Sequence, residues 1–248
     1  MNNQHLEAVQ KWYPNAKTTI DAVNIAFDLI ESKFQLKPNQ LMMADSVCCD
    51  DVNTIQYPPR AYEMLGPFKM GGLDGYPFAG LTGMGAFAHH VPKDGAVLVF
   101  YAPHIGITKD AIIGEIHRFG QSKNSACCGA AKGALGKLLN SEIVEGNISE
   151  IDYQMNTIEQ IFLKQESRIK SAENQLFEAT KVMYEAIDAR IEELVSKTQY
   201  PCKYVILIGA IYINGDKDMG SFCTYNKFDV VDLSTQKRQS LLEEYHTH

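Results

Sequence analysis

The stretch Ala-Val-Leu-Val-Phe-Tyr occupies residues 96–101, and Pro103-His104 follows it one residue later. An apolar run that does not alternate with polar residues predicts a β-strand covered on both faces, as in a parallel sheet. Residues 204–213 have the same character, and 41–47 is interpreted as a strand that ends at the first cysteine pair. Because all three lie among segments with helical spacing, we expect an α/β protein with a central sheet and flanking helices.

The residue composition and the spacing of apolar residues change along the chain. We expect a single domain over 1–248 that is built from successive segments. They are an N-terminal helical segment at 1–39, a site-bearing core at 40–145, a long helix at 151–198, and C-terminal strands at 203–233. The long helix carries one apolar stripe, which predicts that it covers the sheet or forms a dimer surface. We expect the strand at 222–233 to lie at an edge.

Bulk composition excludes several classes of protein. The chain has 248 residues and a formal net charge of −7, without a long basic run, so we expect no nucleic-acid partner. The longest uncharged apolar stretch, 204–213, is about half the length that spans a bilayer, so we expect no membrane insertion. Residues 1–11 are polar and lack the apolar run of a secretion signal, which indicates a cytoplasmic protein.

The cysteines are unevenly distributed, since four of the six form two adjacent pairs, Cys48-Cys49 and Cys127-Cys128. In a reducing compartment, clustered thiols indicate metal binding or catalysis more often than disulfides. A thiol-redox function is therefore one hypothesis, and a metal site is the other.

Three groups of possible metal ligands stand at the ends of predicted elements. Cys48 or Cys49 follows a strand, His104 follows the next strand, and Cys128 or Cys127 begins a helix over 129–139. Ligands gather at the carboxyl ends of strands in open α/β sheets, and a helix N-terminus lowers the pKa of a thiol. Two thiolates and one imidazole suit zinc, and three protein ligands leave a fourth position open, as in catalytic sites.

A carboxylate lies two residues after each cysteine of the first pair, in the registers Cys48/Asp50 and Cys49/Asp51. Such a carboxylate could accept a hydrogen bond from water at the metal if a bidentate ion pair with an arginine kept it ionised. Arg60 is the nearest candidate in the sequence.

A glycine-rich stretch at 71–85 leads to His89-His90. Its glycine spacing does not match a dinucleotide-binding or phosphate-binding loop. The two histidines could rim a pocket or carry protons, and a ligand role is the least expected.

Four pieces of sequence carry a resemblance to a known family. They are Cys48-Cys49-Asp50-Asp51-Val52-Asn53, the glycine-rich stretch that ends in His89-His90-Val91-Pro92, Phe100-Tyr101-Ala102-Pro103-His104-Ile105, and Ser125-Ala126-Cys127-Cys128-Gly129-Ala130. Together they resemble the limiting-CO2-inducible protein B/C family, the theta-class carbonic anhydrases, over about residues 40–140. The resemblance implies a fold like that of β-class carbonic anhydrases.

The resemblance also implies the site. Its zinc ligands fall on Cys48, His104 and Cys128, and its acid–arginine pair falls on Asp50 and Arg60. The doubled cysteines keep Cys49 with Asp51, and Cys127, as alternatives. The spacing departs from the β class, because His104 and Cys128 are 24 positions apart (128 − 104) and Arg60 lies ten past Asp50 (60 − 50).

The function implied is reversible, zinc-dependent hydration of carbon dioxide to bicarbonate. In this hypothesis Phe87 lines the CO2 pocket, and His89 or His90 carries the proton away. The family also implies a homodimer. One alternative is a CO2- or bicarbonate-binding or assembly protein that has the same zinc site but is catalytically silent, and the other is the thiol-redox protein.

Overall fold

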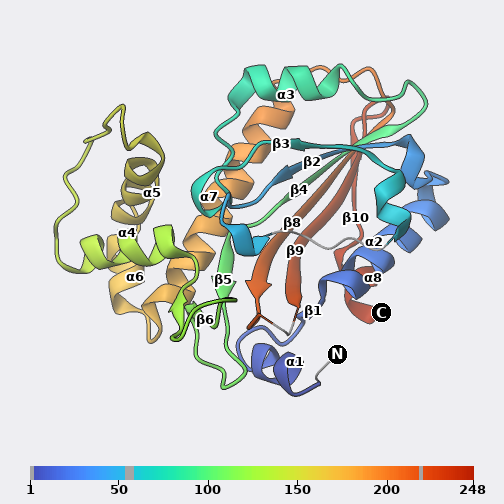
Figure 1. Ribbon diagram of the computed structural model, residues 1–248. Coiled ribbons are helices and arrows are strands. Elements are labelled where there is room, and N and C mark those ends of the chain that lie inside the picture. Colours follow the sequence, from blue (N-terminus) through green and yellow to red (C-terminus); the bar gives the residue numbers. More distant parts are fainter. Residues whose placement is uncertain (1–2, 54–58, 218–219) are drawn as a thin grey trace.

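The centre of the molecule is a set of parallel strands (Figure 1). The computed structural model describes residues 3–53, 59–217 and 220–248. Strand β4 (Ala96–Tyr101) lies between β2 (Leu41–Ser46) and β8 (Tyr204–Asn214) and runs parallel to both. The three strands expected from the sequence are therefore neighbours in the sheet and almost wholly buried, which confirms the expected α/β class.

The rest of the sheet extends this centre, in the order β1-β9-β8-β4-β2-β3. The outer strands are β3 (Leu65–Lys69), β9 (Ser221–Asp232), β1 (Lys17–Thr18), β10 (Lys237–Ser240) and β5 (His104–Gly106), which pairs with β8. The expectation of an edge position for β9 was wrong: β9 pairs with β8 on one side and with the short β1 and β10 on the other. A two-stranded sheet of β6 (Glu115–Ile116) and β7 (Ser125–Ala126) stands apart.

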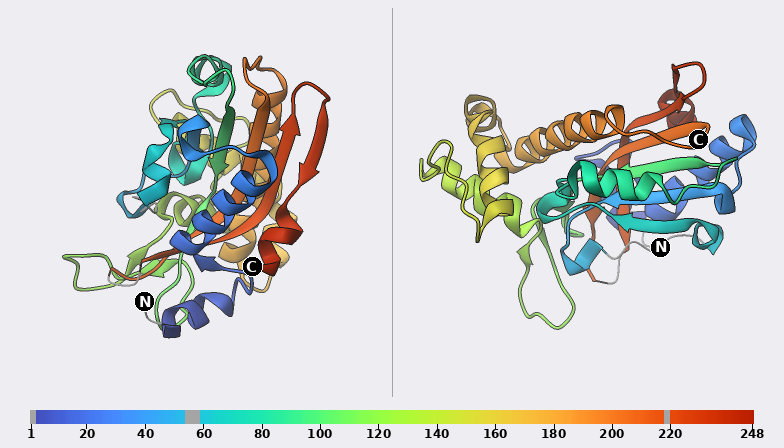
Figure 2. Two further views of the ribbon diagram at one scale, coloured as in Figure 1. Left: turned by 90° about the vertical axis from the view of Figure 1, so that its right-hand side faces the viewer. Right: turned by 90° about the horizontal axis from the view of Figure 1, so that it is seen from above.

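Helices cover both faces of the sheet, which explains why the central strand β4 is apolar throughout (Figure 2). In β4, Val97 and Val99 belong to the core under α7 (Gln175–Ser196), whereas Leu98 and Phe100 belong to the core under α2 (Thr19–Phe34). Successive side chains of a strand point to opposite faces, so burial on both sides requires a run without polar alternation.

The helical zone at 151–198 is three helices rather than one. They are α5 (Tyr153–Leu163), α6 (Glu166–Ser171) and α7, which begins after the Asn174 side chain caps the backbone N–H of Phe177. The apolar stripe of α7 is buried against the sheet, so it covers the sheet. Helix α4 (Gly129–Leu139) lies where the sequence predicts it and forms a lobe with α5 and α6 beside the sheet (Figure 1).

The remaining elements are short. They are α1 (Asn3–Gln10), α3 (Gly80–Ala88), α8 (Leu242–Thr247), and the 3-10 turns η1 (Pro38–Gln40), η2 (Asp51–Asn53), η3 (Pro59–Glu63) and η4 (Leu73–Gly75). The sequence did not predict α3, since three of its nine residues are glycines, which disfavour helix formation. Within the described ranges, every helix is too short or too polar to cross a membrane.

A half-buried carboxylate on α7 links this helix to strands β9 and β10. Glu192 accepts hydrogen bonds at 2.7 Å from Lys227 on β9 and from both terminal nitrogens of Arg238 on β10. Burial raises the pKa of Glu192, but these bonds outweigh it and lower the pKa from 4.5 to about 2. A carboxyl with a depressed folded pKa stabilises the fold above its unfolded pKa, and this stabilisation disappears as the pH falls through the folded value.

We therefore expect Glu192→Gln to lower the free energy of unfolding at pH 7 by about 1 kcal/mol, after allowance for solvent screening. The difference between wild type and variant should shrink as the pH falls from 4.5 towards 2. Urea unfolding at both ends of this range measures it. Glu173→Gln, which changes an exposed glutamate just before α7, is the control. A difference that does not change with pH would contradict the assignment.

Candidate metal centre

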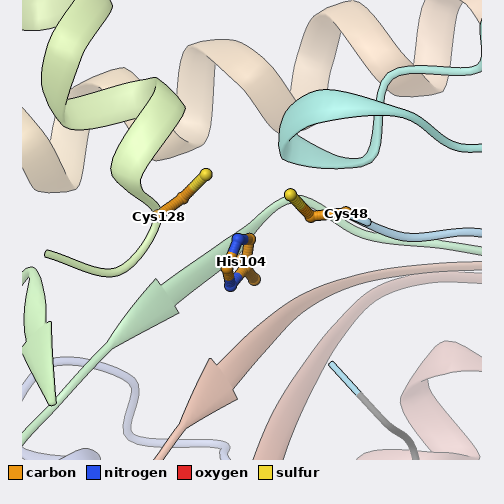
Figure 3. Close-up of side chains that lie close together, drawn as sticks. All are labelled: Cys48, His104 and Cys128. Carbon is orange, nitrogen blue, oxygen red and sulfur yellow. The ribbon is translucent and has the colours of Figure 1, made fainter. Parts of the chain in front are cut away.

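Three candidate ligand side chains from distant parts of the chain meet at the carboxyl ends of the parallel strands. Cys48 lies just after β2, His104 begins β5, and Cys128 immediately precedes α4. Their ligand atoms all lie within 4.8 Å of one another, and all three residues are buried. Figure 3 shows the two sulfur atoms and the imidazole ring turned toward one another.

The strand register brings Cys48 and His104 together. Ser46, the last residue of β2, pairs with Tyr101, the last residue of β4. The two chains therefore leave adjacent parallel strands at the same edge, and each reaches its ligand within three residues. The carboxyl edge of a parallel sheet is a common place for such convergence.

Backbone contacts bring the third ligand to this edge. The N–H of Gly106 on β5 donates to Cys127 O at 2.8 Å, and the N–H of Cys127 donates to Gly114 O at 3.0 Å. A Cβ at position 106 would stand 2.8 Å from the Cys127 Cβ and 2.7 Å from Glu115 O, so only glycine permits this approach. The close packing places Cys128 at the N-terminus of α4, facing the other two ligands.

The protonation of the cluster suits a cation. A hydrogen bond from Cys128 is the largest influence on Cys48 and, together with His104, lowers the pKa of Cys48 to about 4 although burial opposes it. The same bond and burial raise the pKa of Cys128. Burial opposes a charge on His104, whereas hydrogen bonds with Cys127 and Cys48 raise its pKa. A metal ion binding here would displace the shared protons and take up the negative charge of the thiolates.

The two nitrogens of His104 differ in their surroundings. Nδ1 lies 2.7 Å from the side-chain oxygen of Asn214, whereas Nε2 is buried and has no hydrogen-bond partner within the described ranges. Buried polar atoms are rarely unpartnered, and a lone pair that faces a metal position accounts for this one. The donor set of two sulfurs and one imidazole nitrogen therefore fits zinc.

The alternative cysteines lie elsewhere. Cys49 is exposed to solvent. Cys127 is buried, but its sulfur lies 3.5 Å from His104 Nδ1 and 3.3 Å from Asn214 Oδ1, on the side of the ring away from Nε2. The cluster with His104 is therefore formed by Cys48 and Cys128 rather than by Cys49 and Cys127.

An arginine clamps the carboxylate that follows Cys48. Arg118 donates from its two terminal nitrogens to the two oxygens of Asp50, both at 2.8 Å, and also to the exposed Asp51. Its Nε donates to Ser125 Oγ on β7, just before the second cysteine pair. Burial raises the pKa of Asp50, but the hydrogen bonds with Arg118, Asp51 and the backbone of Val52 together outweigh burial and hold that pKa well below its usual range.

This clamp differs from the expected one. The sequence favoured Arg60 as the partner of Asp50 because it was the nearest arginine, and the structure gives that position to Arg118. The side chain of Arg60 lies outside the described part of the structure. Arg118 is 68 positions from Asp50, and only its place shortly before Cys127-Cys128 could have indicated that it returns to the site.

The residues expected to line a substrate pocket lie in different places, with Phe87 in the same apolar core as Cys48 and Cys128 and the two histidines at the surface. Phe87 is fully buried and packs on Phe68, with ring centroids 6.0 Å apart. His89 and His90 are exposed at the end of α3, shortly before β4 begins, whereas His104 follows the end of β4. A strand of six residues is about 20 Å long, so the two histidines lie at the opposite end of β4.

Asp74 is a site neighbour that the sequence did not single out. The turn η4 presents its backbone N–H to Cys48 Sγ at 3.1 Å, and its carboxylate accepts from the backbone N–H of His104 at 3.3 Å. Complete burial raises the pKa of Asp74 to about 7. The sequence Asp74-Gly75 signals a turn, but nothing in it indicates that the turn packs on the ligands.

A mostly parallel α/β sheet with a buried Cys-His-Cys cluster at the carboxyl ends of its strands defines a protein like the β carbonic anhydrases, with a candidate metal site. The chain belongs to the limiting CO2-inducible proteins B/C beta carbonic anhydrases, whose family model matches residues 17–232. The family resemblance of its motifs is therefore confirmed.

Solved structures agree with this assignment. PtLCIB4, described as a homolog of the limiting CO2-inducible protein LCIB, is 26% identical with a TM-score of 0.79, over 95% of this chain and 98% of that one. A single-site variant of PtLCIB4 gives a TM-score of 0.81 at 26% identity, over 95% and 97% of the two chains. LCIB itself, at 19% identity and a TM-score of 0.70 over 93% and 95%, shows the same fold. No curated protein sequence matches the chain.

Proposed function

We propose that the chain holds one zinc ion through Cys48, His104 and Cys128 and interconverts carbon dioxide and bicarbonate. The observation that carries the proposal is the buried cluster of these three side chains, with ligand atoms within 4.8 Å of one another. Membership of a family named for β carbonic anhydrases supports the reaction. Zinc in such a site supplies a Lewis acid that lowers the pKa of water from its bulk value to about 7.

In this proposal Asp50 orients the attacking water. Arg118 engages both of its oxygens and keeps it ionised. Oδ1 also accepts from the backbone N–H of Val52, so Oδ2 is the oxygen that retains a lone pair for a further hydrogen bond. Asp50 accepts the hydrogen of the water, which directs the oxygen lone pair at the carbon of CO2. Two thiolate ligands donate more charge to the ion than imidazoles do, so we expect the rate to rise toward mildly alkaline pH.

Stopped-flow measurement of CO2 hydration tests the proposal. Protein loaded with zinc should accelerate hydration, protein stripped with a chelator should not, and added zinc should restore the rate. Zinc-loaded protein that binds one ion per chain but leaves the uncatalysed rate unchanged would contradict catalysis and favour the silent binding or assembly protein.

The thiol-redox alternative has less support. Cys49 is exposed, but its neighbour Cys48 and both Cys127 and Cys128 are buried, and thiol–disulfide exchange requires access of an attacking sulfur. Thiol titration before and after chelation distinguishes the two hypotheses, because metal-held thiols become reactive only once the metal is removed.

The homodimer implied by the family remains a prediction. Light scattering on the full chain measures it, with the dimer expected at about twice the chain mass of 27.7 kDa.

A further inference from the structure

The side chain of Asn214 contacts all three segments that carry the proposed ligands. Asn214 ends β8 and is buried. Its oxygen lies 2.7 Å from His104 Nδ1 and 3.3 Å from Cys127 Sγ, next to Cys128. Its nitrogen donates to Val52 O at 2.9 Å and to Asn53 Oδ1 at 3.1 Å, in the loop that follows Cys48.

Strand pairing places this amide beside the imidazole. In the parallel pair of β5 and β8, His104 is opposite Tyr212. Asn214 comes two residues after Tyr212, and side chains two apart on a strand share a face. His104 and Asn214 therefore project from the same side of adjacent strands.

The partners of Asn214 fix the direction of each hydrogen bond. The backbone oxygen of Val52 can only accept, so the amide nitrogen must face the loop. Asn53 uses its own nitrogen toward Cys48 O, at 3.5 Å, and so presents its oxygen to Asn214. The oxygen of Asn214 then faces His104 and can only accept.

An acceptor at this position determines the tautomer of the imidazole. His104 Nδ1 must carry a hydrogen to donate to Asn214, which leaves the lone pair of the neutral ring on Nε2. Nε2 is the buried nitrogen without a hydrogen-bond partner among the described residues. The same amide thus holds the ring in the form that binds a cation and ties the ring to the loops of the two cysteines.

We infer that Asn214 is the positioning residue of the metal centre, which orients His104 through Nδ1 and fixes the spacing of the three ligand segments. The inference rests on the metal site of the proposed function but not on turnover. Partners of metal-ligating histidines typically contribute about 10–100-fold to metal affinity. Asn214 is expected to affect the binding of a divalent cation. Co²⁺ is the probe because its visible spectrum depends on the geometry of the groups that coordinate it.

The test compares Co²⁺ binding by wild type and Asn214→Ala, through competition with a chelator and through the visible absorption bands. We expect the variant to bind Co²⁺ about 10–100-fold more weakly, with shifted bands. Asn214→Asp keeps the acceptor for His104 but loses both donors to the Cys48 loop, so its affinity should fall between the two. Asn156→Ala removes another buried amide, which contacts Ser149 and Glu159, and should leave Co²⁺ binding unchanged.

The zinc-loaded wild type gives a second measurement that does not depend on a variant folding. Nitrogen-15 NMR of the His104 ring should show a hydrogen on Nδ1 and the metal on Nε2. Metal on Nδ1, or a folded Asn214→Ala protein with wild-type affinity and spectrum, would overturn the inference. A wild type that binds no Co²⁺ would overturn it together with the site. Wild type that binds Co²⁺ as expected but does not hydrate CO2 would contradict the proposed reaction alone.

Discussion

Cys128→Ser is expected to remove the metal from the protein, and with it the hydration of CO2. The thiolate is one of three protein ligands, and serine is a poor donor to zinc because its hydroxyl stays protonated. We expect the affinity to fall by more than the factor of about 10–100 that loss of an outer hydrogen-bond partner costs. Metal content after dialysis against a chelator measures the loss, and circular dichroism checks the fold.

The neighbouring cysteine provides the matched control. Cys127 is equally buried, but its sulfur faces Asn214 and the Nδ1 side of His104. A serine there can still donate to the Asn214 oxygen, so Cys127→Ser should retain the metal with a smaller loss of affinity. If Cys127→Ser released the metal and Cys128→Ser kept it, the ligand register would be wrong by one residue.

Asp50→Asn should keep the metal and lower the rate of CO2 hydration by about 100-fold, the lower end of the range for a positioned acid–base group. The amide keeps one oxygen acceptor, but its NH2 group is directed at the Arg118 guanidinium, which also carries only donors. The side chain is expected to rotate away, and the attacking water loses the group that orients it. Stopped-flow rates on protein of verified metal content measure the effect.

Two comparisons make this result specific. Asp51→Asn changes the exposed neighbour, whose side chain is 85% accessible, and should alter the rate little. Arg118→Ala should lower the rate almost as much as Asp50→Asn, whereas Arg60→Ala should not. A large loss in Asp51→Asn with none in Asp50→Asn would assign the role to Asp51.

Much of the fold could be predicted because the sheet is buried on both faces. Runs of apolar residues such as 96–101 identify its central strands without knowledge of what covers them. The edge assignment of β9 failed because the short strands β1 and β10, which flank it, have two and four residues. Segments of that length carry no periodicity that could reveal a strand. Helix α3 was missed because its glycines mask its helical pattern.

The sequence could predict which segments carry the candidate ligands, but it left open which cysteine of each pair faces the site, and it did not predict the surroundings. Cysteine and histidine at element ends are visible in a sequence, since few other roles call for those residue types in clusters. Arg118, Asp74 and Asn214 reach the cluster only through tertiary packing, from a loop, a turn and a strand end. Arg60 was chosen by nearness in sequence, and a clamp that spans 68 positions cannot be found that way.

X-ray absorption at the zinc edge of the purified protein tests the central claim most directly. Two sulfur neighbours at about 2.3 Å, one histidine nitrogen at about 2.0 Å and one further light atom are expected, with one zinc per chain. Four sulfur neighbours, or no bound zinc in a folded protein that has been supplied with it, would contradict a centre formed by Cys48, His104 and Cys128.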